Sequence, residues 1–146
     1  TTQDDTDHLG RVLAQYARAG DCFLLRGHIG SGKSALARAF IRTLLGPDTE
    51  VPSPTFTLVQ TYDCDSLEIW HADLYRLGDA QEAVELGLTD AFTDHISLIE
   101  WPELLGDLTP NTALDIELSV APDCHLATLT FGENWCDRLK EFAHDA

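Results

Sequence analysis

The chain has 146 residues, 44% of them hydrophobic, which favours one globular domain and includes no apolar run near the roughly 18 residues of a membrane span. Its 25 acidic and 9 basic residues give a formal net charge of −16, which argues against direct binding to a nucleic-acid backbone, because that binding depends on clustered Lys and Arg. Residues 1–7 lack a signal-peptide pattern, and the four cysteines lie far apart without metal-ligand spacing, so we expect a cytoplasmic protein with reduced thiols and no membrane association.

The first predicted element is an amphipathic helix over residues 6–20. Leu9, Val12 and Leu13 begin an apolar stripe at helical spacing, with Thr6 as the cap and Gly20 as the end. A helix in front of a central strand most simply covers one face of a sheet. Its start, including Thr6, could also help to hold a nucleotide base.

An apolar strand pattern over residues 22–25 leads into a glycine-rich loop, and a helical pattern follows until Gly46 and Pro47. The loop and the residue after it are Gly27-His28-Ile29-Gly30-Ser31-Gly32-Lys33-Ser34-Ala35. This loop matches the phosphate-binding pattern G-x-x-x-x-G-K-[ST], in which backbone N–H groups face the phosphates, Lys33 supplies a charge and the Ser34 hydroxyl can bind Mg²⁺. The order of strand, loop and helix, with six of the nine basic residues before position 43, favours a nucleotide site over a purely structural loop.

A stiff connection follows the second helix. Pro52 and Pro54 exclude helix and favour an extended chain. The hydroxyls of Ser53 and Thr55 can sense a γ-phosphate, directly or through the metal. An ordinary proline-rich turn explains the same residues equally well.

Two acidic residues at predicted strand ends are candidates for metal or water chemistry. Residues 55–63 and 67–73 alternate as the strands of a β-hairpin, so Asp73 emerges at a strand end, where it can reach a metal-bound or nucleophilic water. Residues 96–100 form a short apolar strand that ends in Glu100, the pattern of a Walker B carboxylate. Asp73 and Glu100 therefore compete for the metal role, although a lone Asp is more often a turn or cap residue.

The remaining patterns complete an α/β domain. A capping box at residues 79–82 begins a helix through Leu88, and Pro102 suits the first turn of a short helix. Residues 114–120 and 126–131 are expected to pair as antiparallel strands, and Trp135, Leu139 and Phe142 form the apolar stripe of a final helix. We therefore predict one domain over residues 1–146, with a mixed central sheet flanked by helices, parallel near the phosphate loop and antiparallel toward the C-terminus.

With these pieces in place, the sequence resembles the TsaE (YjeE) family of small P-loop ATPases, which are needed for threonylcarbamoyladenosine (t6A) modification of tRNA. The resemblance covers about residues 6–120 and has four motifs in the family's order. These are the loop at residues 27–34, Ser53-Pro54-Thr55-Phe56, His71-Ala72-Asp73-Leu74-Tyr75-Arg76 and Ile99-Glu100-Trp101-Pro102-Glu103. Two departures are His28, where an acid is usual, and Ser31, where alanine is common.

The resemblance implies a P-loop ATPase that binds ATP and Mg²⁺. It places the nucleotide against the glycine loop with Lys33, the metal on Ser34 and Glu100, and a switch at Asp73. The segments that sense the nucleotide or a partner contain Ser53, Thr55, Tyr75, Arg76 and Trp101. It also implies work with the TsaB–TsaD pair, in which TsaD transfers the threonylcarbamoyl group, and contact with tRNA only through that complex.

Two other functions fit the same loop. A small-molecule kinase would usually enclose the phosphates with an arginine-bearing lid, and no lid-like cluster follows Lys33. A nucleotide-dependent binding module would hydrolyse ATP only incidentally. We expect slow ATP hydrolysis by the chain alone, and phosphate release measured with and without partners would separate the three functions.

Overall fold

A six-stranded sheet with the strand order β2-β3-β4-β1-β5-β6 forms the centre of the computed structural model, which describes residues 2–27, 32–54, 57–120, 125–132, 135, 136 and 138. The inner strands are parallel and comprise β3 (Leu67–Asp73), β4 (Ile96–Glu100), β1 (Cys22–Arg26) and β5 (Leu114–Val120). Antiparallel strands β2 (Val59–Cys64) and β6 (His125–Thr130) form the two edges. The predicted mixed α/β fold is confirmed, with antiparallel pairing at both edges.

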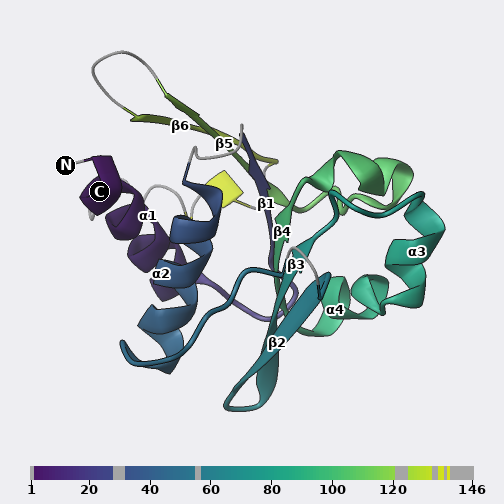
Figure 1. Ribbon diagram of the computed structural model, residues 1–146, viewed down its shortest axis with the longest axis horizontal. Coiled ribbons are helices and arrows are strands. Elements are labelled where there is room, and N and C mark those ends of the chain that lie inside the picture. Colours follow the sequence, from purple (N-terminus) through teal and green to yellow (C-terminus); the bar gives the residue numbers. More distant parts are fainter. Residues whose placement is uncertain are drawn as a thin grey trace.

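Helices cover both faces of this sheet (Figure 1). On one face lie α1 (Thr2–Tyr16) and α2 (Lys33–Leu45), and on the other lie α3 (Ala80–Glu85), α4 (Leu88–Asp94) and the 3₁₀ helix η1 (Pro102–Leu108). Each face has its own core of buried apolar side chains. Alternate residues of β1 enter the two cores, since Phe23 and Leu25 pack toward α2 whereas Leu24 packs toward η1 and α4.

The apolar stripe of α2 explains how the helix is held against the sheet. Leu36, Phe40 and Ile41 are fully buried, and the Phe40 ring lies 5.2 Å from the ring of Phe23 in an edge-on arrangement. In β5, Leu114 and Ile116 are buried while Glu117 is exposed, as the predicted alternation requires. These contacts fix the first residue of α2 at the carboxyl end of β1.

Helix α1 begins earlier than the sequence pattern predicts. It starts at Thr2 and ends at Tyr16, so Thr6 is a buried residue inside the helix and the prediction of Thr6 as its cap is wrong. Gly20 also lies beyond the helix, in a turn where its φ is +89°. The polar residues before Thr6 carry no apolar periodicity, which is why the pattern could not show the first turn.

The helix predicted after residue 79 is divided in two. Asp79 does cap α3, because its Oδ1 accepts a hydrogen bond from the backbone N–H of Glu82 at 3.2 Å. Gly87 then interrupts the helix at φ +91°, and a Cβ there would lie 3.3 Å from the Trp70 ring. The left-handed glycine therefore separates α3 from α4, which begins at Leu88, and its missing Cβ leaves room for the Trp70 ring.

The structure describes only residues 135, 136 and 138 of the predicted C-terminal helix. Trp135 is buried, its ring lies 5.5 Å from Phe23, and its indole N–H donates to the carbonyl of Thr112 at 2.9 Å. Leu139 and Phe142 lie outside the described residues. Within the described part, no helix is both long and apolar enough to cross a membrane.

Candidate nucleotide site

The carboxyl ends of β1, β3 and β4 meet the start of α2 at one edge of the sheet. Asp73 is in register with Glu100, and Glu100 with Leu25. Paired residues on neighbouring parallel strands point to the same face, which here is the face that α2 covers, because Leu25 belongs to that core. Both strand-end carboxylates therefore lie on the side where α2 begins with Lys33.

Two glycines frame the phosphate loop. Gly27 and Gly32 have φ values of 142° and 110°, in a region that L side chains rarely adopt. A Cβ on Gly32 would also lie 3.3 Å from Cγ2 of Thr6, so the loop packs closely against α1. The residues between the glycines, and one predicted sensing residue, lie outside the described residues: His28, Ile29, Gly30, Ser31 and Thr55.

Lys33 is held inside this edge of the protein. Its side chain is buried, and its ammonium group donates to the carbonyl oxygen of Gly27 and lies 4.0 Å from the ring centroid of Trp101. Burial lowers the pKa of Lys33, while the negative charges of Glu100 and Asp73 act in the opposite direction. The ring face and the nearby carboxylates keep the cation at the loop.

Ser34 and Glu100 meet across the gap between α2 and β4. The Ser34 hydroxyl donates to Oε1 of Glu100 at 3.2 Å, although the residues are 66 positions apart in the sequence. In the described part of the chain, no group of three or more His, Cys, Asp or Glu could hold a metal by itself. One hydroxyl and one carboxylate nevertheless fit Mg²⁺, which prefers hard oxygen ligands and usually keeps several waters beside one or two carboxylates and phosphates.

His71 is a member of the site that the sequence analysis did not assign. Its Nε2 lies 2.6 Å from Oε2 of Glu100, and the residue is 1% exposed. Glu100 thus lies between Ser34 on one oxygen and His71 on the other. A signal existed in the strand alternation, because His71 stands two residues before Asp73 and must point to the same face of β3.

Asp73 ends β3 with its carboxylate turned to the following backbone. Its Oδ1 accepts a hydrogen bond from the N–H of Tyr75 at 3.0 Å, and the residue is buried. Asp73 therefore has the turn role that the sequence analysis gave as its alternative function. Its charge also acts on Lys33, so Asp73 belongs to the same electrostatic environment as Glu100. We name Lys33, Ser34, His71, Asp73 and Glu100 the strand-end cluster.

Trp101 forms a cover over Lys33. It directly follows Glu100 and adopts a left-handed backbone conformation with φ 56° and ψ 55°, which costs a non-glycine residue roughly 1 kcal/mol or more. Its ring lies 4.9 Å from the ring of Tyr75, which is 64% exposed. The left-handed turn at Trp101 places its ring on the lysine, and Tyr75, from the turn after β3, contacts that ring at the surface.

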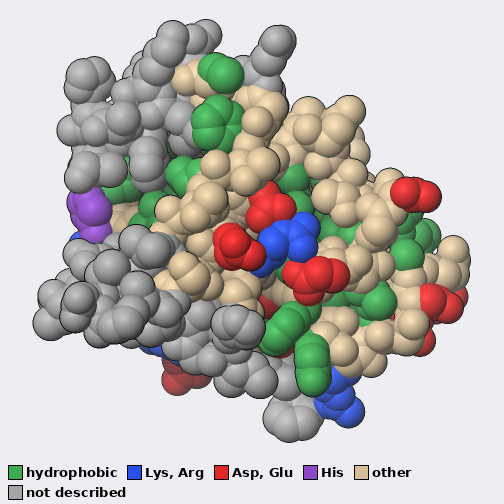
Figure 2. All heavy atoms as spheres, turned by 90° about the horizontal axis from the view of Figure 1, so that it is seen from above, with side chains coloured by type: hydrophobic (Ala, Val, Ile, Leu, Met, Phe, Trp, Pro, Cys, Tyr) green, Lys and Arg blue, Asp and Glu red, His purple; other side chains and the backbone are tan. Residues whose placement is uncertain are grey.

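Arg26, the last residue of β1, is held by two acidic side chains. Its Nε donates to both carboxylate oxygens of Asp115, at 3.0 and 2.8 Å, and its Nη1 pairs with Glu103 at 2.8 Å. Figure 2 views the molecule from above and shows acidic side chains gathered around a basic one, with hydrophobic side chains beside them. Arg26 thus ties β1 to β5 and to η1, directly after Trp101.

The other predicted residues lie around the strand-end cluster rather than in it. Thr6 is buried beside Gly32, and Ala35 is half-buried on α2. Ser53 is exposed. Arg76 is exposed and lines a separate hollow of about 410 Å³ with residues of α3.

Known proteins resemble this chain over most of its length. The family model described as "Threonylcarbamoyl adenosine biosynthesis protein TsaE" matches residues 1–125. A "tRNA threonylcarbamoyladenosine biosynthesis protein TsaE" from Rickettsia felis is 37% identical over 81% of this chain and 69% of its own length. The protein of that name from Bacillus subtilis is 33% identical over 82% of this chain and 75% of its own length.

A solved structure agrees with these sequence relatives. The crystal structure of Bacillus subtilis YdiB has a TM-score of 0.80 and 27% identity, and the match covers 100% of this chain and 93% of that one. The family model matches well over half of the chain, and the B. subtilis relative is more than 30% identical over most of both sequences. The chain therefore belongs to the TsaE family.

Proposed function

We propose that this chain binds ATP with Mg²⁺ at the strand-end cluster, hydrolyses it slowly, and supports t6A modification of tRNA together with the TsaB–TsaD pair. The observation that carries the proposal is the contact between Ser34 and Glu100 at 3.2 Å beside the buried Lys33. A loop hydroxyl, a loop lysine and a strand-end carboxylate are the groups that a P-loop uses for a nucleotide and its metal. The family's printed name supports the link to t6A biosynthesis.

Each residue of the strand-end cluster has a separate task in this proposal. Lys33 supplies positive charge to the β- and γ-phosphates. Ser34 and Glu100 would hold Mg²⁺, which when bound neutralises the phosphate charge. His71 restrains one oxygen of Glu100, which leaves the carboxylate oriented before the nucleotide arrives.

Asp73 is the candidate for water or switch chemistry. It lies in register with Glu100 but is bonded to the turn after β3. A carboxylate at this place can orient a water molecule or accept its proton. A movement of the Tyr75 turn would shift Asp73 as well, because the backbone N–H of Tyr75 donates to its carboxylate.

The need for a partner follows from the charges around the site. Arg26 is engaged by Asp115 and Glu103, and Arg76 lines a different hollow. A protein partner can supply the missing charge or order the switch, with gains on the order of 10³-fold or more in related phosphoryl-transfer systems. The net charge of −16 argues that tRNA is reached through that partner rather than directly.

A calorimetric titration of ATP with Mg²⁺ tests the binding step. Lys33→Ala should abolish binding or weaken it strongly, because it removes the positive charge that the loop aims at the phosphates. Arg18→Ala is the matched control, since it removes one exposed positive charge after α1 and should leave the affinity unchanged. Equal affinity in the Lys33 variant would show that the loop is only structural.

A phosphate-release assay with the reconstituted TsaB–TsaD pair tests the enzymatic step. We expect slow release by the chain alone and acceleration in the complex. Transfer of the phosphate to a small-molecule acceptor would instead identify a kinase. Nucleotide-dependent complex formation without acceleration would identify a binding module.

A further inference from the structure

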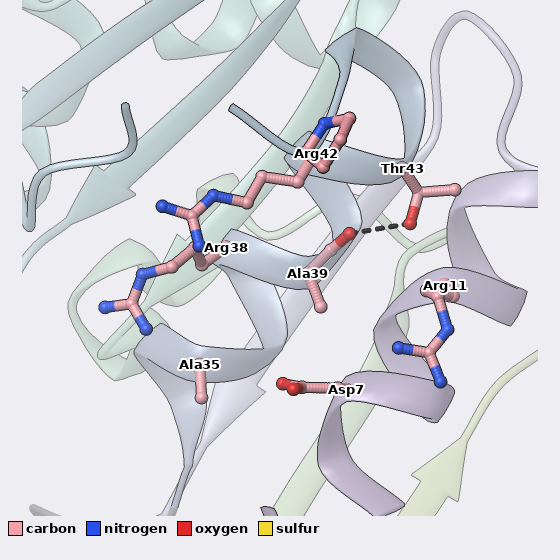
Figure 3. Close-up of a pocket in the computed structure, with 8 residues that line it drawn as sticks. Asp7, Arg11, Ala35, Arg38, Ala39, Arg42 and Thr43 are labelled. Carbon is pink, nitrogen blue, oxygen red and sulfur yellow. Dashed lines mark hydrogen bonds between the residues drawn. The ribbon is translucent and has the colours of Figure 1, made fainter. Parts of the chain in front are cut away.

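A groove of about 470 Å³ runs between α1 and α2, outside the strand-end cluster. Figure 3 shows Arg38 and Arg42 on α2 along one rim, Arg11 on α1 at the other, and Asp7 near one end. Three of the nine basic residues of the chain line this single groove. We name it the arginine groove, defined by Asp7, Arg11, Arg38 and Arg42.

The three arginines of the groove differ in how they are held within the described part of the chain. Arg42 donates from Nε to the carbonyl oxygen of Thr49 at 2.9 Å, which holds its side chain along the rim. Among the residues that the structure describes, Arg11 and Arg38 have no hydrogen-bond or ion-pair partner. Arg38 and Arg42 are also four positions apart on one helix, a spacing at which like charges repel.

The shape of the arginine groove comes from small residues. A Cβ on Gly10 would lie 2.7 Å from the carbonyl oxygen of Leu36, so only glycine lets α1 approach α2 this closely. Ala35 and Ala39 line the groove between the arginine rims. From Ala35 to Thr43 the lined stretch of α2 is roughly 12 Å long, the length of about four extended residues.

The chemistry of the rims selects the ligand. Arginine guanidinium groups bind carboxylates through paired hydrogen bonds. Asp7 at one end repels a ligand that is negative throughout and attracts one with a hydrogen-bond donor or a basic group. A protein segment can carry both kinds of group, whereas a nucleic-acid backbone offers only negative charge, and it would also meet the other acidic residues of a chain with net charge −16.

We propose that the arginine groove binds a short acidic segment of a protein partner, with its carboxylates on Arg11, Arg38 and Arg42 and a donor group toward Asp7. The groove shares Ala35 with the stretch of the phosphate loop, but its three arginines lie outside the strand-end cluster.

Fluorescence anisotropy with labelled synthetic probes tests this surface on the full chain. The probes are a short glutamate-rich peptide with one lysine, the same peptide with glutamine in place of glutamate, and a single-stranded RNA of equal negative charge. We expect salt-sensitive binding of the glutamate peptide, and Arg38→Ala and Arg11→Ala should each weaken it about tenfold or more. Arg18→Ala, with its exposed arginine outside the groove, should bind as the unmodified chain does.

A further variant separates a loss of binding from a loss of folding. Arg38→Gln keeps a long polar side chain, and its thermal unfolding and ATP affinity should match those of the unmodified chain while peptide binding falls. The proposal is overturned if no peptide binds, if Arg18→Ala weakens binding as much as Arg38→Ala, or if the RNA binds more tightly than the glutamate peptide. ATP binding that fails in the unmodified chain would count against the proposed nucleotide function and would leave the peptide result interpretable.

Discussion

The strand-end cluster and the arginine groove are two charged regions on the same side of the sheet, and they differ in how their charges are satisfied. In the strand-end cluster, Glu100 is buried and contacts both Ser34 and His71. In the arginine groove, Arg11 is exposed and Arg38 is half-exposed, and neither has a partner within the described residues. The Glu100 carboxylate is thus paired inside the folded chain, although Nδ1 of the buried His71 has no hydrogen-bond partner in the part of the chain that the structure describes, whereas Arg11 and Arg38 are left open to solvent and to a ligand.

Solvation explains why the two arrangements can coexist. A buried carboxylate without partners would cost several kcal/mol, so the strand-end cluster must be assembled as the protein folds. An exposed guanidinium keeps its water and can remain unpaired at little cost. Substitutions in the strand-end cluster should therefore affect ATP binding or hydrolysis and the stability of the fold together. Substitutions in the arginine groove should change partner binding and leave the fold intact.

The largest expected effect is that of Glu100→Ala on Mg²⁺-dependent ATP binding. Loss of this carboxylate removes a metal ligand and leaves His71 and Ser34 without their shared acceptor. We expect affinity to fall on the order of 10²-fold, about 3 kcal/mol, in calorimetric titrations with Mg²⁺. Glu100→Gln should show the same loss with a better preserved fold, and Asp90→Ala, which removes an exposed carboxylate on α4 at the other face of the sheet, is the control. Unchanged affinity in Glu100→Gln would move the metal role to Asp73.

Asp73→Ala should spare ATP binding and reduce turnover by about 10- to 100-fold, as expected when a residue that orients a water is lost. Asp73→Asn separates this role from the turn, because the amide oxygen can still accept the hydrogen bond from the Tyr75 N–H. Single-turnover phosphate release is the measurement. Full activity in Asp73→Asn would reduce Asp73 to a turn residue.

The fold was largely predictable because its signals are local and periodic. The continuous apolar run of β1, the alternation in β5 and the Pro102 helix start all appear in the structure where the sequence pattern places them. The break at Gly87 has a local signal, a glycine in the left-handed conformation between two helices, which the sequence analysis did not use. The early start of α1 was missed for a different reason, since its first residues are polar on every side.

The site was predictable where a motif fixes the residue type. Lys33 and Ser34 come from the loop motif and Glu100 from the Walker B pattern, and the structure brings the three residues together. The pairing of His71 with Glu100 depends on the register of β3 with β4, and a single sequence does not contain that register. The arginine groove was missed because its three arginines come from two helices, whose facing sides are set by the close approach at Gly10.

A smaller effect concerns a buried group that lies away from both regions. Burial, assisted by the charge of Asp21, strongly raises the pKa of the Cys22 thiol in β1. Above the ordinary value of 9.0, the unfolded chain loses a proton that the folded chain keeps, so the free energy of unfolding falls as pH rises, by up to about 1.4 kcal/mol per unit. Urea titrations between pH 8 and 10 should show this loss, and Cys22→Ala should have a shallower dependence on pH. Identical pH slopes for the two proteins would contradict the assignment.

The smallest expected effect is a gain of stability in the arginine groove. Arg38→Glu replaces a like-charged pair four residues apart on α2 by a Glu–Arg pair in the favourable order, with Arg42 as the partner. Removing the repulsion and adding the attraction contribute roughly 0.2–0.5 kcal/mol each, so the free energy of unfolding should rise by about 0.4–1 kcal/mol in urea at low salt. Arg18→Glu changes the net charge by the same amount outside the helix pair and controls for long-range repulsion. If Arg38→Glu destabilises the chain more than Arg18→Glu does, then Arg38 already stabilises the folded chain, and the contrast between a paired Glu100 and an open groove does not hold.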